Sequence, residues 1–391
     1  MITPGAASSI GNVVICGAGV IGTSIAYHLA KLGVPSRIID PIGLAPAASG
    51  KAGGFLALDW NAGPLDELSR RSFYLHEQLA QDLDLGDTCY RRLRCEAVAV
   101  DGSDRVFQPS QKKLQGLNGI DWADVGVVGS RCLGTTETIA QTHPKVFVEA
   151  LWREAEKLGC EMLIHHVDDV QLSSDGKSVT GVKISQRKNS DEKVSLSTLH
   201  ASPDEQDPSA AEVIPADVVI IAMGPWSSRI KSLPVPQMYG QKYHSAILRP
   251  KRVLDQAVFF QGFGDPEVYP RPDGDVYVCG YPDSPVIVQE EPGSVEVRSE
   301  VVDRLINVAG KLSTELAEAE VVREKCSSCH LPVTANGMPT MGPFSGVKGA
   351  FIATGHSCWG ILNAPATGEA MADLIVKGET SHVDLRPFFP S

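Results

Sequence analysis

The sequence has little of several features, and each lack excludes a class of protein. Its 391 residues contain no apolar run of the roughly 18–20 residues that a membrane span needs, so no span is expected. Lys and Arg number 35 against 47 Asp and Glu, and the net charge of −12 argues against a nucleic-acid partner. The first residues lack the basic and apolar regions of a secretory signal, and the last three are not a peroxisomal signal. We therefore expect a cytoplasmic protein.

Cysteine is also used in a way that excludes a disulfide scaffold. The nine cysteines are an odd number and are scattered through a long chain, which favours reduced thiols in the cytosol. Cys326 and Cys329 form the one close pair, and a zinc site would need a second pair at similar spacing. No metal is expected.

One stretch near the start carries the clearest pattern. The apolar run Val13–Cys16 predicts a buried strand, and Gly17, Gly19 and Gly22 follow in G-x-G-x-x-G spacing. Apolar residues then recur at helical spacing, and a second apolar run ends at Asp40, 18 positions after the last glycine. This strand–turn–helix–strand unit is typical of dinucleotide binding.

The residue types in this unit suit a dinucleotide. Glycines permit the tight turn, the close approach of a pyrophosphate and close packing of helix on strand. The helix N-terminus offers free N–H groups and a partial positive charge to the phosphates. Asp40 is placed to accept hydrogen bonds from a ribose diol, and an acid there argues against a 2′-phosphate. The motif alone leaves NAD and FAD open.

Helical and extended patterns alternate along the rest of the chain. Helices are predicted at 64–83, 144–158, 295–316 and 366–376. Strands are predicted at 90–100, 161–165, 167–172, 179–184, 216–224 and 350–354, and 124–133 is expected to be irregular. The polar stretch 186–212 is expected to be an exposed, mobile insertion.

These patterns predict an α/β protein in two parts. Nucleotide-type segments occur at the start, in the middle and at the end of the chain, with strand-rich segments between them. We expect a Rossmann-like domain built from the discontinuous segments 12–90, 135–235 and 325–391. An inserted β-rich substrate domain, a mixed sheet with helices, would comprise 91–134 and 236–324.

The chain resembles the D-amino-acid-oxidase superfamily of FAD-dependent oxidoreductases, which includes glycine oxidase and monomeric sarcosine oxidase. It looks closest to a fungal and plant branch of FAD-dependent oxidoreductases. The resemblance covers nearly the whole chain and rests on residues 14–40, 49–55, 218–227 and 348–375, of which the last is the most specific. It favours FAD over NAD.

The resemblance implies which residues hold FAD. They would contact its pyrophosphate, ribose, adenine and flavin ring: Gly17, Ala18, Gly19, Val20, Ile21, Gly22, Asp40, Pro41, Ser49, Gly50, Lys51, Ala52, Gly53, Gly54, Val167, Gly224, Trp226, Cys329, Gly355, His356, Trp359, Gly360 and Ile361. Cys329 lies near the position where sarcosine oxidase bonds covalently to its flavin, so attachment there is one hypothesis and a small buried thiol beside non-covalent FAD is the other.

The resemblance also implies a reaction. Substrate would lie over the flavin, hydride would pass from the carbon next to nitrogen to flavin N5, and molecular oxygen would accept the electrons. The candidate catalytic residues are Lys51, Glu267, Tyr269 and Trp359. Lys51 would supply a positive charge near the flavin, or simply a phosphate-binding or solvated charge. His143 with Pro144 is expected to start a helix.

The departures from the family concern the substrate. Leu331 lies where glycine oxidase has an arginine that binds the substrate carboxylate, and no second cation follows around Cys358. Glu267 lies where those enzymes have a tyrosine over the flavin. It would hold a cationic amine or take its proton, unless it is only a surface glutamate at a strand end.

We therefore expect an oxidase of a C–N bond in a small amine or N-substituted amino compound without a simple α-carboxylate. One alternative is a dehydrogenase or biosynthetic oxidase of a larger metabolite that uses another acceptor. A flavin-binding regulatory or trafficking protein with weak or no catalysis is the alternative of another class.

Overall fold

The structure, a computed structural model, describes residues 10–100, 120–186 and 212–390. A six-stranded sheet in the order β19-β20-β12-β1-β2-β8 forms its first centre. All neighbours in it pair in parallel except β19 with β20. Its strands are β1 (Val13–Cys16), β2 (Arg37–Ile39), β8 (Glu161–Leu163), β12 (Val218–Ile221), β19 (Thr340–Pro343) and β20 (Ala350–Thr354).

Both faces of this sheet are covered, which explains why its strands are continuous apolar runs. Val13 and Ile15 of β1 belong to a core shared with the helices on one face, whereas Val14 and Cys16 pack toward a three-stranded sheet on the other. The helices are α1 (Val20–Lys31), α3 (Pro64–Asp82), α4 (Pro144–Lys157) and α7 (Gly360–Lys377). The covering sheet consists of β9 (His166–Leu172), β10 (Val179–Ser185) and β11 (Glu212–Pro215).

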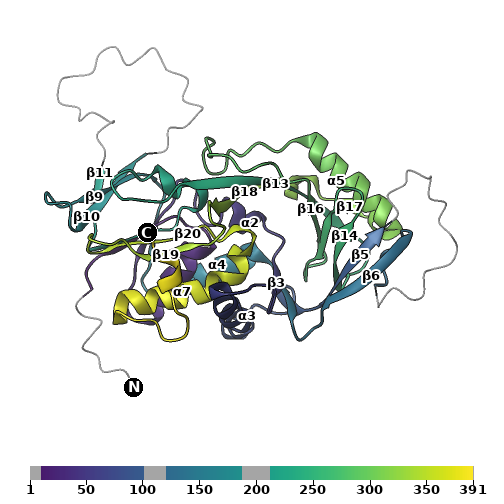
Figure 1. Cartoon of the computed structure of the whole chain (residues 1–391), viewed down its shortest axis with the longest axis horizontal. Helices are drawn as coiled ribbons and strands as arrows, with labels where there is room; N and C mark the ends of the chain where they lie inside the picture. The colour runs from purple at the N-terminus through teal and green to yellow at the C-terminus, as the bar shows by residue number, and fades with distance from the viewer. Residues whose placement is uncertain (1–9, 101–119, 187–211, 391) are drawn as a thin grey trace, which may run out of the picture.

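A second, eight-stranded sheet forms the other end of the molecule, with α5 (Ser299–Leu312) and its extension α6 (Thr314–Ala317) packed on it (Figure 1). The long strand β13 pairs with β18 along its first part and with β16 along its last part. The strands are β5 (Arg94–Val100), β6 (Val127–Gly134), β13 (Met238–Arg249), β14 (Gln256–Gln261), β15 (Glu267–Pro270), β16 (Val276–Gly280), β17 (Glu320–Val321) and β18 (Ser327–Thr334).

A small sheet lies between these two centres. Its order is β3-β7-β4, with β3 (Phe55–Ala57), β7 (Ile139–Thr142) and β4 (Tyr90–Arg92), and the short helix α2 (Ala48–Lys51) precedes it. The sequence places residues 325–334 in the nucleotide domain, but most of them form β18, which pairs with β13 of the large sheet. The division into domains stays a prediction.

The mixed α/β fold is confirmed, with corrections to three predicted segments: 124–133, 295–316 and the start of the last helix. Residues 124–133 were expected to be irregular, but β6 occupies most of them; it is an edge strand with most side chains exposed, so it shows no apolar alternation. The helix expected at 295–316 is interrupted at Ser313, whose Oγ accepts the N–H of Leu316 and caps α6. The insertion expected at 186–212 lies, apart from its two end residues, outside the described residues.

The last helix begins at Gly360 rather than at Ala366, although Pro365 lies inside it. Pro365 has no N–H, so the carbonyl oxygen of Ile361 loses its helical donor. The Nε2 atom of His76, on α3, lies 2.8 Å from that oxygen. Complete burial lowers the pKa of His76 to about 4, so its ring is neutral and Nε2–H can donate this bond.

Candidate functional site

The glycine turn after β1 forms one wall of a long pocket. Gly17 has a φ of +108°, and a Cβ there would lie 2.5 Å from the carbonyl oxygen of Ala222. A Cβ at Gly22 would lie 2.1 Å from the carbonyl oxygen of Gly17, so α1 packs closely against the turn. The first N–H groups of α1 therefore lie next to the pocket, where they favour an anion such as a phosphate.

A second segment supports the start of this helix. Gly19, the N-cap residue of α1, has no side chain to cap it. Ser49 Oγ, from α2, accepts the N–H of Val20 at 2.9 Å instead. Both Gly19 and Ser49 line the pocket. The Ser49 hydroxyl, which caps α1, therefore lies in the pocket wall next to the N–H groups of the first turn that have no partner in the helix.

Asp40, at the end of β2, is buried in the same pocket wall. Its Oδ2 accepts the N–H of Ala18 at 3.0 Å, and its Oδ1 accepts the N–H groups of Ile42 at 2.9 Å and Gly43 at 3.1 Å. Burial raises the pKa of Asp40, although the three N–H groups act in the opposite direction. The carboxylate therefore holds the glycine turn and the following loop in place, and it retains lone pairs toward the pocket.

A long irregular segment, residues 286–297, crosses the outer side of the pocket; we call it the strap. Trp226 Nε1 donates to the carbonyl oxygen of Glu290 at 2.7 Å, and Arg229 Nη1 donates to Glu291 Oε1 at 2.8 Å. Trp226, Arg229 and Glu291 all line the pocket. The strap therefore forms part of the pocket wall through Glu291 and Pro292.

The loop between β20 and α7 forms the far end of the pocket. Gly355 and Ser357 have positive φ angles of 82° and 52°, which turn the chain sharply into the helix. His356 is fully buried, its Nε2 lies 3.1 Å from Thr367 Oγ1, and burial lowers its pKa to about 3. Gly360 begins α7 and lines the pocket, so the N-terminus of an 18-residue helix is directed at this end.

The structure brings most of the predicted cofactor residues together around this pocket. Those that line it are Gly17, Gly19, Val20, Ile21, Asp40, Pro41, Ser49, Ala52, Val167, Gly224, Trp226, Gly355, His356, Gly360 and Ile361. Those that do not line it are Ala18, Gly22, Gly50, Lys51, Gly53, Gly54, Cys329 and Trp359. Sequence reasoning missed His166, Arg229, Glu291 and Cys358 as lining residues. His166 and Cys358 adjoin predicted positions, whereas nothing in the sequence points to the strap.

Two of the predicted glycines serve packing behind the pocket. A Cβ at Gly53 would lie 2.4 Å from Cδ2 of Tyr269, and a Cβ at Gly54 would lie 1.9 Å from the carbonyl oxygen of Thr142. The carbonyl oxygen of Gly53 accepts Gln141 Nε2–H at 3.0 Å. These contacts press the segment after α2 against both the small sheet and the large sheet.

Lys51 and Cys329 lie side by side next to the pocket. Lys51 Nζ donates to the carbonyl oxygen of Ser328 at 3.1 Å, and burial lowers the pKa of the Lys51 amine. Cys329 is fully buried, and burial raises the pKa of its thiol to about 11, although the charge of Lys51 acts in the opposite direction. The thiol is therefore protonated and a poor nucleophile.

Glu267 lies in a half-buried cluster at the far end, not on an open surface. Its Oε2 accepts a short hydrogen bond from the Tyr269 hydroxyl and a weaker one from Cys279 Sγ at 3.4 Å. Burial and then the charge of Glu267 raise the pKa of Tyr243 to about 12 and raise the pKa of Cys358. Because Cys358 lines the pocket, Glu267 acts electrostatically on the far end of the pocket.

Five aromatic rings form a connected set that reaches Glu267 through Tyr269, and we call them the aromatic wall. Their ring centroids lie 5.1–6.3 Å apart in a connected set, and Tyr269 belongs both to this set and to the Glu267 cluster. The members come from β3, the loop after it, β14, β15 and the loop before α7: Phe55, Trp60, Phe259, Tyr269 and Trp359.

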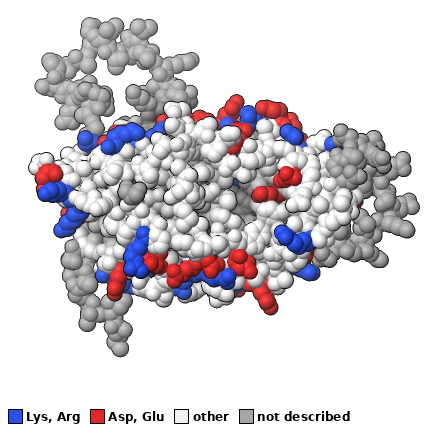
Figure 2. Space-filling view, viewed as in Figure 1, with Lys and Arg blue, Asp and Glu red and all other residues white. Residues whose placement is uncertain are grey.

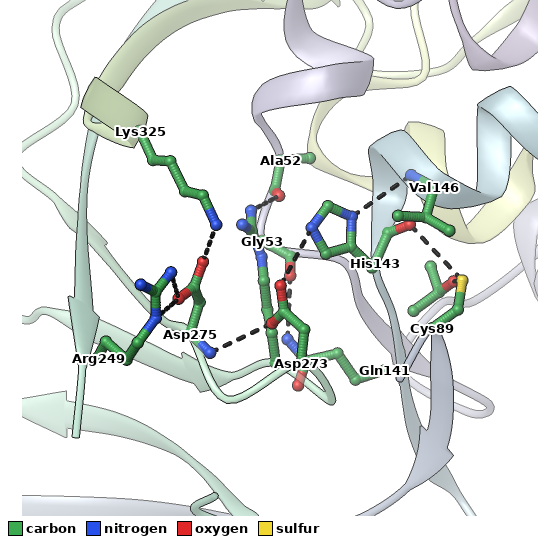
Figure 3. Close-up of polar contacts among 12 residues, drawn as sticks. Ala52, Gly53, Cys89, Gln141, His143, Val146, Arg249, Asp273, Asp275 and Lys325 are labelled. Carbon is green, nitrogen blue, oxygen red and sulfur yellow. Dashed lines mark hydrogen bonds and ion pairs between the residues drawn. The ribbon is translucent and has the colours of Figure 1, made fainter. Parts of the chain in front are cut away.

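Polar contacts join the nucleotide part to the large sheet beneath this region (Figure 3). His143 Nδ1 accepts the N–H of Val146 at 3.4 Å and caps α4, which confirms its predicted helix-start role. Its Nε2 lies 3.5 Å from Asp273 on the β15–β16 turn. Beside this turn, Asp275 binds Arg249 and Lys325 at 2.7 and 2.5 Å. These groups are paired with one another and stabilise the junction.

Charges of both signs are distributed along the rims of the face shown in Figure 2, where the described residues form no continuous basic patch. Among the helices in the described ranges, none is long and apolar enough to cross a membrane. The described part of the chain also holds no group of three or more side chains of the types that ligate a metal.

The sequence profile of the family described as DAO, FAD dependent oxidoreductase, matches residues 12–374. The chain belongs to this family. As a DAO-family protein it is an FAD-dependent oxidoreductase, which decides between FAD and NAD.

Named relatives agree with this assignment. TDA3 of Saccharomyces cerevisiae, an inferred oxidoreductase, is 27% identical over 97% of this chain and 94% of its own. Glycine oxidase of Bacillus licheniformis is 24% identical over 93% of each chain. The crystal structure of glycine oxidase from Geobacillus kaustophilus superposes with a TM-score of 0.73 at 21% identity, covering 97% of this chain and 98% of that one. This last likeness shows the fold.

The pocket of this DAO-family chain fits FAD on its own geometry. Gly17 and Gly22 leave no room for a Cβ, and they provide the tight turn and the close packing of helix on strand that a dinucleotide-binding unit requires. Asp40 is buried beside that turn without a cationic partner among the described residues. The α7 N-terminus lies at the opposite end, where it suits an electron-rich ring edge.

Proposed function

We propose that this protein is an FAD-dependent oxidase of a C–N bond in a small amine, with molecular oxygen as the electron acceptor. The observation that carries the proposal is the position of Glu267, a half-buried carboxylate next to the far end of the pocket. Pocket residues at this end, such as Leu331 and Cys358, carry no positive charge. The names of family neighbours, glycine oxidase and L-amino acid deaminase, support an amino substrate.

Different pocket residues would hold different parts of the cofactor. The α1 N-terminus with Ser49 would hold the pyrophosphate, Asp40 the adenosine ribose, and Val167 the adenine through its backbone. The α7 N-terminus at Gly360 would face the electron-rich edge of the flavin ring. Bound FAD supplies a two-electron acceptor for the hydride that leaves the substrate carbon.

The chain's own groups would position the amine and move its proton. Glu267 would hold the ammonium and then take one proton, which leaves the neutral amine from which hydride can depart. Tyr269, through its hydrogen bond, fixes the orientation of the carboxylate. Trp359, beside the pocket loop, would cover the substrate, and Lys51 would place a positive charge near the site of oxygen reduction.

We propose non-covalent attachment of FAD. Cys329 does not line the pocket, and its thiol is protonated because burial raises its pKa to about 11. Acid precipitation separates the two hypotheses, because yellow colour in the supernatant means free FAD and colour retained in the pellet means a covalent bond.

The free state of all nine cysteines supports a cytoplasmic location.

Anaerobic mixing of the FAD-loaded protein with a panel of amines tests the function. Bleaching of the flavin by one of them, followed by rapid recolouring and peroxide release in air, is expected. Slow recolouring in air would mean that the protein is a dehydrogenase with another acceptor. Absence of bleaching by every amine, with FAD bound, would contradict an amine oxidase and favour a binding role.

A further inference from the structure

The aromatic wall presents ring surface that the protein leaves partly uncovered. Phe55, Trp60, Phe259 and Trp359 are only half-buried, whereas Tyr269 is 7% exposed behind them. Phe55 stacks on Tyr269 with centroids 5.2 Å apart, and Trp60 meets Trp359 edge to face at 6.3 Å. Half-exposed rings from several separate chain segments favour a ligand with apolar or aromatic surface.

The wall and Glu267 belong to one site. Phe259 and Glu267 are register partners across the β14–β15 pair, so their side chains share a face of the sheet. Tyr269 donates its hydroxyl hydrogen to Glu267 and stacks on Phe55. At the other side, Trp359 follows Cys358, which lines the cofactor pocket. A ligand that extends from the pocket past Cys358 would therefore contact both ring surface and carboxylate.

Glu267 has no cationic partner among the described residues, because its two donors are a phenol and a thiol. The neighbouring cations are used elsewhere. Lys51 Nζ donates to the carbonyl oxygen of Ser328, and Arg271 Nη2 donates to that of Ala52 at 2.7 Å. A half-buried carboxylate without a counter-charge favours a ligand that brings one.

The negative charge of Glu267 and the neutral residues around it disfavour a carboxylate on the ligand. Two neutral residues line the pocket here: Leu331, in β18, and Cys358, in the loop before α7. Leu331 and Cys358 would offer a substrate carboxylate no positive charge, and Glu267 would repel it. An ammonium group is instead attracted both to the carboxylate and to the faces of the rings.

We infer that the substrate is a monocationic arylalkylamine without a carboxylate, whose aryl group packs on the aromatic wall while its ammonium group pairs with Glu267. This inference rests on the proposed function, since it names the substrate class of the same site. It predicts a preference for cationic over anionic ligands of equal shape.

Binding of two aryl probes to the FAD-loaded protein tests this preference without turnover. Benzyltrimethylammonium has no amine lone pair to support hydride loss, and benzoate is an anion of similar size. The visible absorbance of the flavin should change in a saturable way with benzyltrimethylammonium and not with benzoate. Tighter binding of benzoate would overturn the inference.

Variants then assign the effect to residues. Glu267→Gln should weaken binding of benzyltrimethylammonium about 10- to 30-fold, and Trp60→Leu about 3- to 10-fold, with Trp60→Phe intermediate. Glu320→Gln is the matched control, because Glu320 is 67% exposed and paired with Arg249 on the same sheet. Equal weakening in the control, or none in Glu267→Gln, would refute the pairing.

The reaction of amines distinguishes this inference from the proposed function. N-methylbenzylamine should bleach the flavin much faster than sarcosine, which is also an N-methylamine but bears a carboxylate in place of the aryl group. Faster bleaching by sarcosine would contradict the substrate class and leave the oxidase intact. Saturable binding of the cation without bleaching by any amine would contradict the oxidase and leave the recognition site intact.

Discussion

Replacement of Asp40 by asparagine tests how the pocket recognises its cofactor. The carboxylate accepts three backbone N–H groups, at 3.0 Å from Ala18 and at 2.9 and 3.1 Å from Ile42 and Gly43. An amide keeps one acceptor oxygen and places an NH₂ group where the other oxygen was. If the oxygen stays with Ile42 and Gly43, the new NH₂ group faces the Ala18 N–H, donor against donor.

The magnitude follows from these bonds. Loss of a hydrogen bond to a charged group costs about 1.5–3 kcal/mol, and removal of a buried charge recovers part of it, so the apoprotein should lose about 1–2 kcal/mol of unfolding free energy. Loss of the carboxylate toward the ribose should weaken FAD binding by about 10- to 100-fold.

Two measurements separate the structural role of Asp40 from its ligand role. Urea unfolding of the apoprotein reports the first, and quenching of FAD fluorescence on binding reports the second. Asp217→Asn is the matched control, since Asp217, an exposed residue directly before β12, also accepts a backbone N–H, at 2.8 Å from Asn12. Unchanged FAD affinity in Asp40→Asn would refute contact with the ribose, and unchanged unfolding would refute the role in the turn.

Three further predictions concern packing, charge and pH. Gly22→Ala places a Cβ 2.1 Å from a backbone carbonyl oxygen and should abolish FAD retention, whereas Gly129→Ala, whose Cβ meets nothing within 4 Å, should not; equal retention would contradict the packing argument. Lys51→Met should slow recolouring of the bleached flavin in air by about tenfold, measured by stopped flow, and an unchanged rate would leave Lys51 only its bond to Ser328. Burial lowers the pKa of three histidines to about 4 or 3, below the 6.5 of the unfolded chain, so their contribution to stability is present above about pH 6.5 and lost as pH falls toward about 4. The unfolding free energy from urea titrations should be lower at about pH 5 than at pH 7 by roughly 2 kcal/mol per histidine, and a value independent of pH would contradict this. These histidines are His28, His76 and His356.

Local patterns predicted many of the residues that line the pocket around the glycine turn, because spacing along the chain decides their position. That these residues hold the nucleotide stays a prediction. Gly17, Gly22 and Asp40 lie in one continuous unit of strand, turn, helix and strand, whose geometry is set by neighbours in sequence. The loop before α7 was found for the same reason. The helix after this loop was predicted to begin too late, because a proline such as Pro365 is more common in the first turn of a helix than in its interior. His76, which lies beside the carbonyl oxygen that Pro365 leaves without a helical donor, is far away in the sequence, so local patterns do not reveal it.

The substrate side could not be predicted to the same extent, because long-range pairing assembles it. Trp60 and Phe259 meet with centroids 5.3 Å apart although nearly 200 positions separate them in the chain. The strap has neither helical nor strand periodicity, so nothing local marks Glu291 as a pocket residue. Glu267 was found by comparison with the family; its partner Tyr269 lies two residues farther along β15, and its partner Cys279 lies opposite it in the pairing of β15 with β16.

The pocket wall draws on separate segments that lie between Gly17 and Ile361, so parts of the chain that are far apart in sequence must be in place before the cofactor finds its full set of contacts. Bound FAD would therefore stabilise the folded arrangement of all these segments together. At a free concentration 100 times its dissociation constant it would add about 2.7 kcal/mol to the unfolding free energy. Flavin supply thus becomes a determinant of how much of this protein a cell retains, independently of how fast the protein turns over its substrate.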